Sequence, residues 1–234
     1  EVILAVHHMS SKIKSYFAGG LRLGIDIIYS EEDSPLGTGG AIKKAQRYLD
    51  DTFLVLNGDS YSKINLEDFL NFHNAKKSNF TISLTKSDNA INYGGVTLEG
   101  NKVNSFVEKG IGGHSLINTG IYLFEPKIFD YIPADKPISL EKEVFPRLVA
   151  ENSLFGYVYQ DYFIDIGRPE TYKQFKHDVL DSLSLRGDEK LINAMKKMKS
   201  NGINLILVVD DDKKLKGVLT DQIINSYLLK EKSI

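Results

Sequence analysis

Short apolar runs alternate with helical patterns along the first part of the chain, and this alternation limits the fold more than any other feature. The runs at residues 2–6, 25–29 and 53–56 predict buried strands. Helical patterns lie between and after them, beginning at Ser10 or Ser11, near Ala41 and after the cap residue Asn65. Such alternation predicts a mostly parallel sheet covered by helices.

The middle of the chain changes to strands with short connections. We expect these strands at residues 80–85, 94–98, 103–108, 120–124, 154–159 and 162–166. Ser139 is placed to cap a helix that continues to Val149, with Pro146 straining its interior. A parallel half followed by a mixed half predicts one α/β domain with a mixed sheet, covering residues 1–178.

The pattern starts again in the last part of the chain, residues 179–234. Leu191, Ile192, Met195 and Met198 follow helical spacing, two apolar runs at 205–209 and 215–219 flank a polar turn, and a further helix continues to Leu229. This α-β-β-α unit is near the lower size limit for a stable core. We therefore expect it to pack on the main domain or on another copy of itself.

Charge and cysteine content exclude several classes of function. The formal net charge is −2, so the chain has no broad basic surface for nucleic acid or an anionic membrane. No apolar run approaches the ~18 residues of a membrane span. Cysteine is absent, which excludes disulfides, thiolate zinc sites and cysteine nucleophiles and fits a reducing compartment. These features predict a cytoplasmic protein with no nucleic acid or membrane partner.

A glycine-rich segment, Leu36-Gly37-Thr38-Gly39-Gly40, precedes the helix expected at Ala41. Glycines let a backbone approach a ligand closely, and a helix N-terminus presents free N–H groups. The spacing fails as a dinucleotide fingerprint, because Ile42 occupies the third glycine position, and no Lys-Ser/Thr follows as in a P-loop. That argues against an NAD-binding dehydrogenase. A simple tight turn remains the alternative to a ligand site.

Two carboxylates follow or end predicted strands far apart in the sequence. Asp59 follows the 53–56 strand after Asn57 and Gly58, and Asp165 lies between apolar neighbours near the end of the 162–166 strand. Ligands bind at the carboxyl ends of strands in open α/β sheets, and Mg²⁺ prefers oxygen ligands that it shares with phosphates. Two such aspartates could share one ion. The alternatives are that Asp59 caps a turn and that Asp165 pairs with a nearby Lys or Arg.

A third group consists of small or polar residues near other strand ends: Gly94, Glu108, Lys109 and Asn118. Such groups suit the recognition of sugar hydroxyls. Each is also ordinary turn chemistry when considered alone.

Seven motifs in this order resemble the sugar-1-phosphate nucleotidyltransferase family, most closely its heptose- and mannose-1-phosphate guanylyltransferases. They are Pro35–Ala41, Leu56–Asp59, Tyr93–Val96, Phe106–Lys109, Asn118–Tyr122, Ser139–Pro146 and Ile164–Glu170. The resemblance implies a Rossmann-like, GT-A-like mixed sheet, with a nucleoside triphosphate and a sugar 1-phosphate as partners and Mg²⁺ as cofactor. It also implies roles for residues: Asp59 and Asp165 as catalytic metal ligands; Leu36, Gly37, Thr38, Gly39, Gly40, Asn57 and Gly58 toward the nucleotide; and Gly94, Glu108, Lys109 and Asn118 toward the sugar.

One motif of that family does not occur before Glu1. The family opens with a strand, a Gly-Gly-x-Gly-Thr-Arg-Leu loop and a Pro-Lys pair that neutralise the leaving pyrophosphate. We therefore expect a domain that lacks its first strand and loop and has impaired catalysis as written, since each lost cationic donor costs ~3–4 kcal/mol. The alternative is a non-catalytic nucleotide-sugar-binding or regulatory protein.

The tail resembles one cystathionine-β-synthase-type (CBS) repeat, through residues 202–210 and 215–221. Such repeats act in pairs and often bind adenine nucleotides. Gln222 and Ile223 occupy the region where the ribose-binding aspartate usually follows. The resemblance thus implies a homo-oligomer that forms through the tail rather than nucleotide binding by it.

Overall fold

The computed structural model describes residues 1–87, 95–107, 116–134 and 136–231. The chain divides into two compact units, residues 1–163 and residues 164–234. Each unit has a hydrophobic core of its own among the described residues. The two units are therefore described separately.

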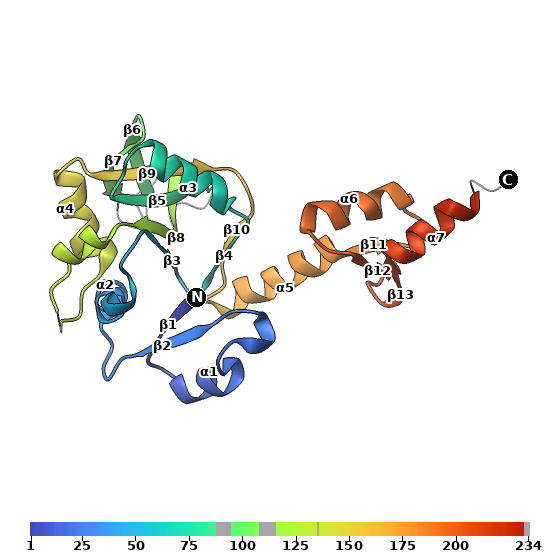
Figure 1. The fold of residues 1–234 in the computed structure, drawn as a ribbon. Helices are drawn as coiled ribbons and strands as arrows, with labels where there is room; N and C mark the ends of the chain where they lie inside the picture. The colour runs from blue at the N-terminus through green and yellow to red at the C-terminus, as the bar shows by residue number, and fades with distance from the viewer. Residues whose placement is uncertain (88–94, 108–115, 135, 232–234) are drawn as a thin grey trace. The chain divides into compact units, whose positions relative to one another are not determined.

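A six-stranded sheet forms the centre of the first unit (Figure 1). Its strands, in spatial order, are β3 (Phe53–Leu56), β8 (Leu116–Phe124), β5 (Phe80–Lys86), β9 (Leu154–Tyr159), β7 (Lys102–Val107) and β6 (Gly95–Glu99). Strands β5 and β9 are parallel, and the other neighbouring pairs are antiparallel. The predicted mixed sheet is confirmed. The prediction of a mostly parallel sheet is wrong, because β8 lies between β3 and β5 and is antiparallel to both.

The two faces of β8 belong to different cores. Tyr122 and Phe124 point into the main core, where the Phe145 ring contacts both of their rings. Ile121 and Leu123 point to the opposite face, where they pack with Phe69 of helix α3 (Leu66–Ala75). This alternation follows from the two-residue period of a strand and explains why β8 is buried over most of its length.

Helix α3 begins as predicted at Asn65. The Asn65 side chain accepts hydrogen bonds from the backbone N–H groups of Glu67 and Asp68, at 3.0 and 3.2 Å. These bonds satisfy two N–H groups that the first turn of a helix leaves without partners.

A small parallel pair accounts for the start of the chain. Strand β1 (Val2–Val6) pairs with β2 (Ile27–Glu31), and α1 (Ser10–Phe17) and η1 (Leu21–Leu23) connect them. The second strand lies two residues later than predicted. Gly20, with a φ of +85°, lies in the turn after α1, and its N–H group donates to the Phe17 carbonyl.

The helices beside the sheet differ from their predicted bounds. Helix α2 (Gly37–Lys44) begins four residues before the predicted Ala41 and is followed by η2 (Gln46–Tyr48). Ser139 caps a π-helical turn, η5 (Leu140–Val144), which leads into α4 (Phe145–Ala150). Pro146 therefore stands in the first turn of α4, where a missing N–H group costs little, rather than inside a continuous helix.

The remaining elements of the first unit are short. They are β4 (Ser60–Ser62) and η4 (Pro126–Asp130), and β10 (Phe163–Asp165) crosses the boundary between the units.

The second unit contains the predicted α-β-β-α pattern, preceded by one further helix and one further strand. Its elements are α5 (Pro169–Leu183), β11 (Ser184–Arg186), α6 (Leu191–Asn201), β12 (Leu205–Val209), β13 (Leu215–Thr220) and α7 (Asp221–Glu231). Strand β11 pairs in parallel with β12, and β12 pairs antiparallel with β13. The predicted boundary after residue 178 lies within α5, and this division into domains stays a prediction.

No helix in the described residues combines the length and the apolar character that crossing a membrane requires.

Candidate functional site

The glycine-rich segment forms the first turns of α2, instead of preceding a helix that begins at Ala41. The Gly39 and Gly40 N–H groups donate to the Ile138 carbonyl at 2.9 and 3.4 Å, and the Ile138 N–H group donates to Leu36. A Cβ atom on Gly39 would lie 2.2 Å from the Ile138 side chain, and one on Gly37 would lie 2.6 Å from the Ile138 carbonyl oxygen. The glycines therefore allow the backbone before η5 to pack directly on α2.

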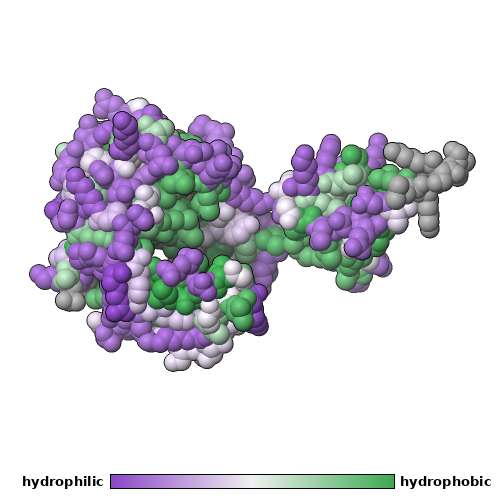
Figure 2. Space-filling model, viewed as in Figure 1, coloured by the Kyte–Doolittle hydropathy of each residue, from purple (hydrophilic) through white to green (hydrophobic). Residues whose placement is uncertain are grey.

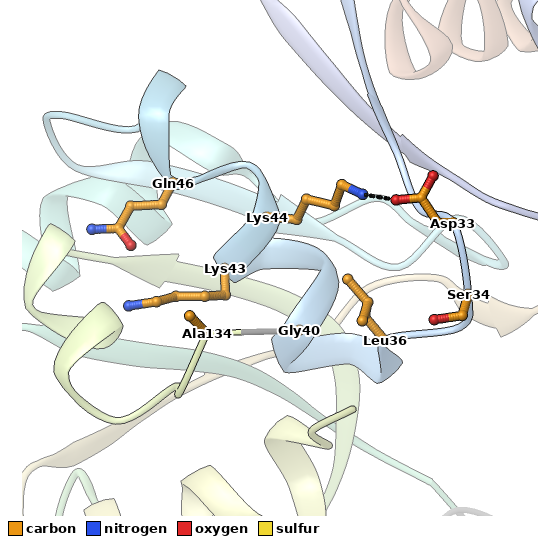
Figure 3. A pocket seen from close by; sticks show the side chains of 8 residues that line it. All are labelled: Asp33, Ser34, Leu36, Gly40, Lys43, Lys44, Gln46 and Ala134. Atoms are coloured by element: carbon orange, nitrogen blue, oxygen red, sulfur yellow. Dashed lines mark hydrogen bonds and ion pairs between the residues drawn. The ribbon is translucent and has the colours of Figure 1, made fainter. Parts of the chain in front are cut away.

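A pocket of about 350 Å³ lies beside the same helix (Figure 3). Leu36 and Gly40 of the glycine-rich segment line it, together with Lys43 and Lys44. Lys44 forms an ion pair with Asp33 at 3.0 Å, and this hydrogen bond lowers the pKa of the Asp33 carboxyl below its usual value. Lys43 donates to a backbone carbonyl, so both lysine side chains already have partners.

The side chain of Thr38 contacts a different group, the carboxylate of Glu141. The Thr38 hydroxyl donates to Glu141 Oε2 at 2.9 Å, and the Ser139 hydroxyl donates to the same oxygen at 2.8 Å. The other oxygen, Oε1, accepts from the Tyr122 hydroxyl at 3.3 Å. Glu141 stands in the π-helical turn η5, so this turn and α2 are joined through one carboxylate.

Tyr122 extends the network to the predicted sugar-side residue Asn118. The Asn118 Nδ2 atom donates to the Tyr122 hydroxyl oxygen at 2.9 Å, and Asn118 Oδ1 accepts from the Gly120 N–H group at 3.0 Å. The Gly120 carbonyl in turn accepts from the Asn57 N–H group at 2.8 Å. Thr38, Asn118 and Asn57 thus belong to one hydrogen-bonded network, although they come from three separate motifs.

Gly120 is required where β8 passes the end of β3. Its φ is +74°, in the left-handed region that favours glycine, and a Cβ atom there would lie 2.5 Å from the Asn57 amide nitrogen. The Asn57 side chain therefore packs directly on the backbone of β8. This close approach holds the end of β3 beside Asn118.

Comparison with known proteins gives the family of the chain. Residues 1–182 match the nucleotidyl transferase family, and residues 177–230 match the CBS domain. The chain belongs to the nucleotidyl transferase family. Within that family it is 38% identical over 199 residues to the probable mannose-1-phosphate guanylyltransferase 1 of Oryza sativa subsp. japonica, an alignment that covers 82% of this chain and 55% of that protein.

Two further relatives extend the comparison. The UTP–glucose-1-phosphate uridylyltransferase of Synechocystis sp. is 36% identical over 77% of this chain and 51% of its own length. The chain also resembles the solved structure of HddC from Yersinia pseudotuberculosis complexed with GMP-PN. The two align with a TM-score of 0.67 and 32% sequence identity, over 76% of this chain and 78% of HddC. The chain spans about half the length of the curated relatives that it matches.

In this member of the nucleotidyl transferase family, Asp59 lies at the surface. It follows Gly58, shortly after the end of β3. Within the described part of the chain, the Asp59 carboxylate makes no hydrogen bond or ion pair, so the alternative that it caps a turn is not observed. Burial first, and then the Glu141 carboxylate, raise the pKa of the Tyr122 hydroxyl far above its ordinary value; Asp59 contributes in the same direction. Tyr122 therefore stays neutral as a hydrogen-bond donor.

The other predicted metal ligand, Asp165, lies at the end of β10 and is half-buried. Its Oδ1 atom accepts from the Gly167 N–H group at 2.8 Å, and no ion pair with a Lys or Arg occurs among the described contacts. Because Asp165 falls in the second unit, its pairing with Asp59 stays a prediction. Among the described residues, no group of three or more His, Asp or Glu side chains could hold a metal ion.

Three predicted sugar-side residues, Gly94, Glu108 and Lys109, lie outside the described residues. Sequence reasoning gave no role to Tyr122 or Glu141, although both occur in the motifs that it quoted. The local sequence indicates that both side chains lie beside buried residues, but not which groups they bind. Tyr122 and Glu141 are polar groups flanked by residues that the strand and helix periods bury, namely Ile121, Leu123 and Leu140.

Proposed function

We propose that the whole protein is a sugar-1-phosphate guanylyltransferase, which transfers GMP from GTP to a sugar 1-phosphate and releases pyrophosphate. The observation that supports this most directly is the shared network of Thr38, Asn57 and Asn118. The first two come from the predicted nucleotide side and the third from the predicted sugar side. The choice of guanine draws on relatives that are described as mannose-1-phosphate guanylyltransferases.

In this reaction a phosphate oxygen of the sugar 1-phosphate attacks the α-phosphorus of the triphosphate. A new P–O bond forms, the bond to the bridging oxygen breaks, and pyrophosphate leaves. The main tasks of the protein are to position the two phosphates in line and to stabilise the developing charge. We assign Leu36–Gly40, Asn57 and Gly58 to the nucleotide, and Gly94, Glu108, Lys109 and Asn118 to the sugar.

The glycine-rich segment suits the base and ribose better than the phosphates. The N–H groups of Gly39 and Gly40 donate to Ile138, so they are not available to an anion. The pocket beside Leu36 and Gly40 offers both apolar and polar surface. We therefore place the nucleoside, rather than the triphosphate, against the start of α2.

The carboxylate chemistry fits a divalent ion. Asp59 offers exposed carboxylate oxygens that no group in the described residues engages, and Mg²⁺ is commonly held by one or two carboxylates together with substrate phosphates. Asp165 uses its Oδ1 atom in a turn, and its other oxygen has no hydrogen bond from the described residues. Mg²⁺ bound there would neutralise phosphate charge. We propose Asp59 and Asp165 as its ligands.

Release of pyrophosphate tests the proposed activity. The whole protein, given GTP, mannose 1-phosphate and Mg²⁺, is expected to release pyrophosphate only when all three are present, and Asp59→Asn is expected to lower kcat/KM by about 100-fold or more. ATP, UTP and TTP, each with mannose 1-phosphate or glucose 1-phosphate, test the choice of base and sugar. Binding of the nucleotide sugar without turnover of any pair would instead indicate the non-catalytic alternative.

We also propose that the second unit pairs with a second copy of the chain. Helix α7 buries Ile224 in its own core, yet Ile223 and Tyr227 on the same helix are 49% and 55% exposed. Leu215 on β13 is 61% exposed, and Figure 2 shows apolar side chains on the surface of this unit. A small unit with this much exposed apolar surface is stabilised when a partner covers it.

A cytoplasmic location rests on the cysteine-free composition and stays a prediction.

A further inference from the structure

Three hydroxyl groups converge on the Glu141 carboxylate, and each also receives an N–H donor. Thr38 Oγ1 accepts from the Leu140 N–H group at 2.9 Å, and Ser139 Oγ accepts from the Lys142 N–H group at 3.2 Å. The Tyr122 oxygen accepts from Asn118 Nδ2 at 2.9 Å. A hydroxyl has a single proton, so each of the three donates that proton to Glu141.

The same argument fixes the orientation of the Asn118 amide. Its Oδ1 atom accepts from the Gly120 N–H group at 3.0 Å, so its amide nitrogen must face Tyr122. Tyr122 is fully buried, so bulk solvent does not reach its hydroxyl to replace a lost partner. The direction of every hydrogen bond from Thr38 to Asn118 therefore depends on one group that only accepts, an ionised carboxylate.

We propose that Glu141 is a positioning residue that sets the nucleotide side and the sugar side of the site together. It acts through Thr38 on one side and through Tyr122 and Asn118 on the other. This inference rests on the proposed function for the identity of the two ligands. The carboxylate itself need not touch either substrate.

The substitution Glu141→Gln tests this role, because it keeps the size of the side chain but replaces one acceptor oxygen and the negative charge with a neutral amide donor. The new amide nitrogen must face a hydroxyl that already receives an N–H donor, which leaves that hydroxyl proton without an acceptor. Glu143→Gln is the matched control. Glu143 lies in the same π-helical turn, where its Oε1 atom accepts from the Ser139 N–H group at 2.9 Å without contacting Thr38 or Tyr122.

Calorimetry with GTP and with mannose 1-phosphate provides the first test. Glu141→Gln is expected to raise the Kd of both ligands by about tenfold, the usual lower range for loss of a group that orients a ligand-binding residue. Glu143→Gln is expected to leave both values within about twofold of wild type. An increase for one ligand alone, or for neither, overturns the inference.

Amide hydrogen exchange in the ligand-free protein provides a second test that does not depend on the proposed function. In Glu141→Gln the Gly120 and Leu140 N–H groups and the Asn118 side-chain amide are expected to exchange at least about tenfold faster, since their acceptors lose a fixed orientation. Unchanged exchange at Gly120 and Asn118 overturns the inference. If wild type binds neither ligand, the proposed function fails, and the exchange result alone decides whether Glu141 organises the network.

Discussion

Among the described residues, buried polar side chains lie mainly in the first unit, whereas ion pairs at the surface occur in both units. In the first unit, polar groups enter the interior, where Tyr122, Thr119 and Ser83 are buried and hydrogen-bonded. In the second unit, charged groups pair at the surface, as Lys213 does with Asp181 and Arg186 with Asp211. Buried polar groups require a fixed arrangement of partners, whereas exposed ion pairs contribute little and are screened by salt. The first unit is therefore built to hold a site, and the second is held together more weakly.

The hydrophobic cores of the two units also differ, in their content of aromatic side chains. The main core of the first unit contains aromatic rings in mutual contact, among them Phe124, Phe145 and Tyr122. The second core consists of Leu185, Ala194, Met198, Ile206 and Ile224, with no aromatic member among the described residues. Hydrophobic stabilisation grows with the apolar area buried. We therefore expect two separate unfolding transitions, with the second unit unfolding first.

Truncation of a core side chain tests this separation and has the largest expected effect. Phe145→Ala is expected to lower the free energy of unfolding of the first unit by about 3–5 kcal/mol, because it leaves a cavity among packed rings. The transition of the second unit is expected to stay in place. Urea unfolding followed by tyrosine fluorescence and by amide exchange distinguishes the two transitions.

Ile206→Ala is the matched variant in the second core, where Ile206 is fully buried. It is expected to shift only the transition of the second unit, by about 2–4 kcal/mol. If both variants shift a single common transition by the same amount, the two units unfold together and the comparison is wrong.

Glycine substitutions separate backbone strain from close packing at the site. Gly100 and Gly120 both have positive φ values, +59° and +74°, but a Cβ atom on Gly100 would meet no atom within 4 Å. Gly100→Ala is therefore expected to lower the free energy of unfolding by about 1 kcal/mol, from backbone strain alone. Gly120→Ala is expected to cost about 2–4 kcal/mol, because it also displaces Asn57.

Urea unfolding gives these two values, and GTP binding gives a second reading. Only Gly120→Ala is expected to weaken GTP binding, since Gly100 lies in the turn between β6 and β7 and makes no contact with the network. If the two substitutions lower the free energy of unfolding by the same amount, Asn57 does not approach β8 closely in solution.

How far the sequence predicts this molecule depends on the range of the interactions involved. Strands β1, β9 and β12 and the Asn65 cap follow from local pattern and were predicted with their observed bounds. The position of β8 between β3 and β5 depends on long-range pairing, which periodicity does not carry. Likewise, the sequence predicts the start of this helix at Ala41 rather than at Gly37, because Ile138, which packs on the glycines, is remote in the sequence.

The candidate site shows the same division. Motif order predicts Thr38, Asn57 and Asn118 as site residues, and the structure joins these three in one hydrogen-bonded network. The proposed roles of Tyr122 and Glu141 depend on which group donates each hydrogen bond between separate elements. No local sequence pattern contains that information.

Self-association through the second unit is the next test, with a smaller effect on free energy. Ile223→Glu is expected to raise the dissociation constant of the proposed dimer by at least about tenfold, because it replaces an apolar contact of roughly 1.5–3 kcal/mol with a charge. Leu66→Glu, on the first unit, is the matched control, since Leu66 is 47% exposed. Analytical ultracentrifugation that finds both variants as associated as wild type would exclude this face of α7 from the interface.

The smallest effect is expected from a surface ion pair of the second unit. Lys213 Nζ lies 2.7 Å from Asp181 Oδ1 and also contacts His177, so it joins α5 to the turn between β12 and β13. The hydrogen bond from Lys213 lowers the pKa of the Asp181 carboxyl below its usual value of 3.8. A carboxyl with a lowered pKa stabilises the fold above its unfolded pKa, and this contribution is lost as the pH falls through the lower, folded value.

Lys213→Gln is therefore expected to lower the Tm of the second unit slightly at pH 7 and to have progressively less effect below about pH 3.8. High salt is expected to reduce the difference at pH 7, because both partners are exposed. Lys196→Gln removes the same charge from an exposed position without an ion pair among the described contacts, and it controls for net charge. If Lys213→Gln still lowers the Tm by the same amount at pH 2.5 as at pH 7, the lysine acts through packing of its hydrocarbon chain rather than through Asp181. In that case the surface charges of the second unit would contribute even less to its fold than the comparison with the first unit implies.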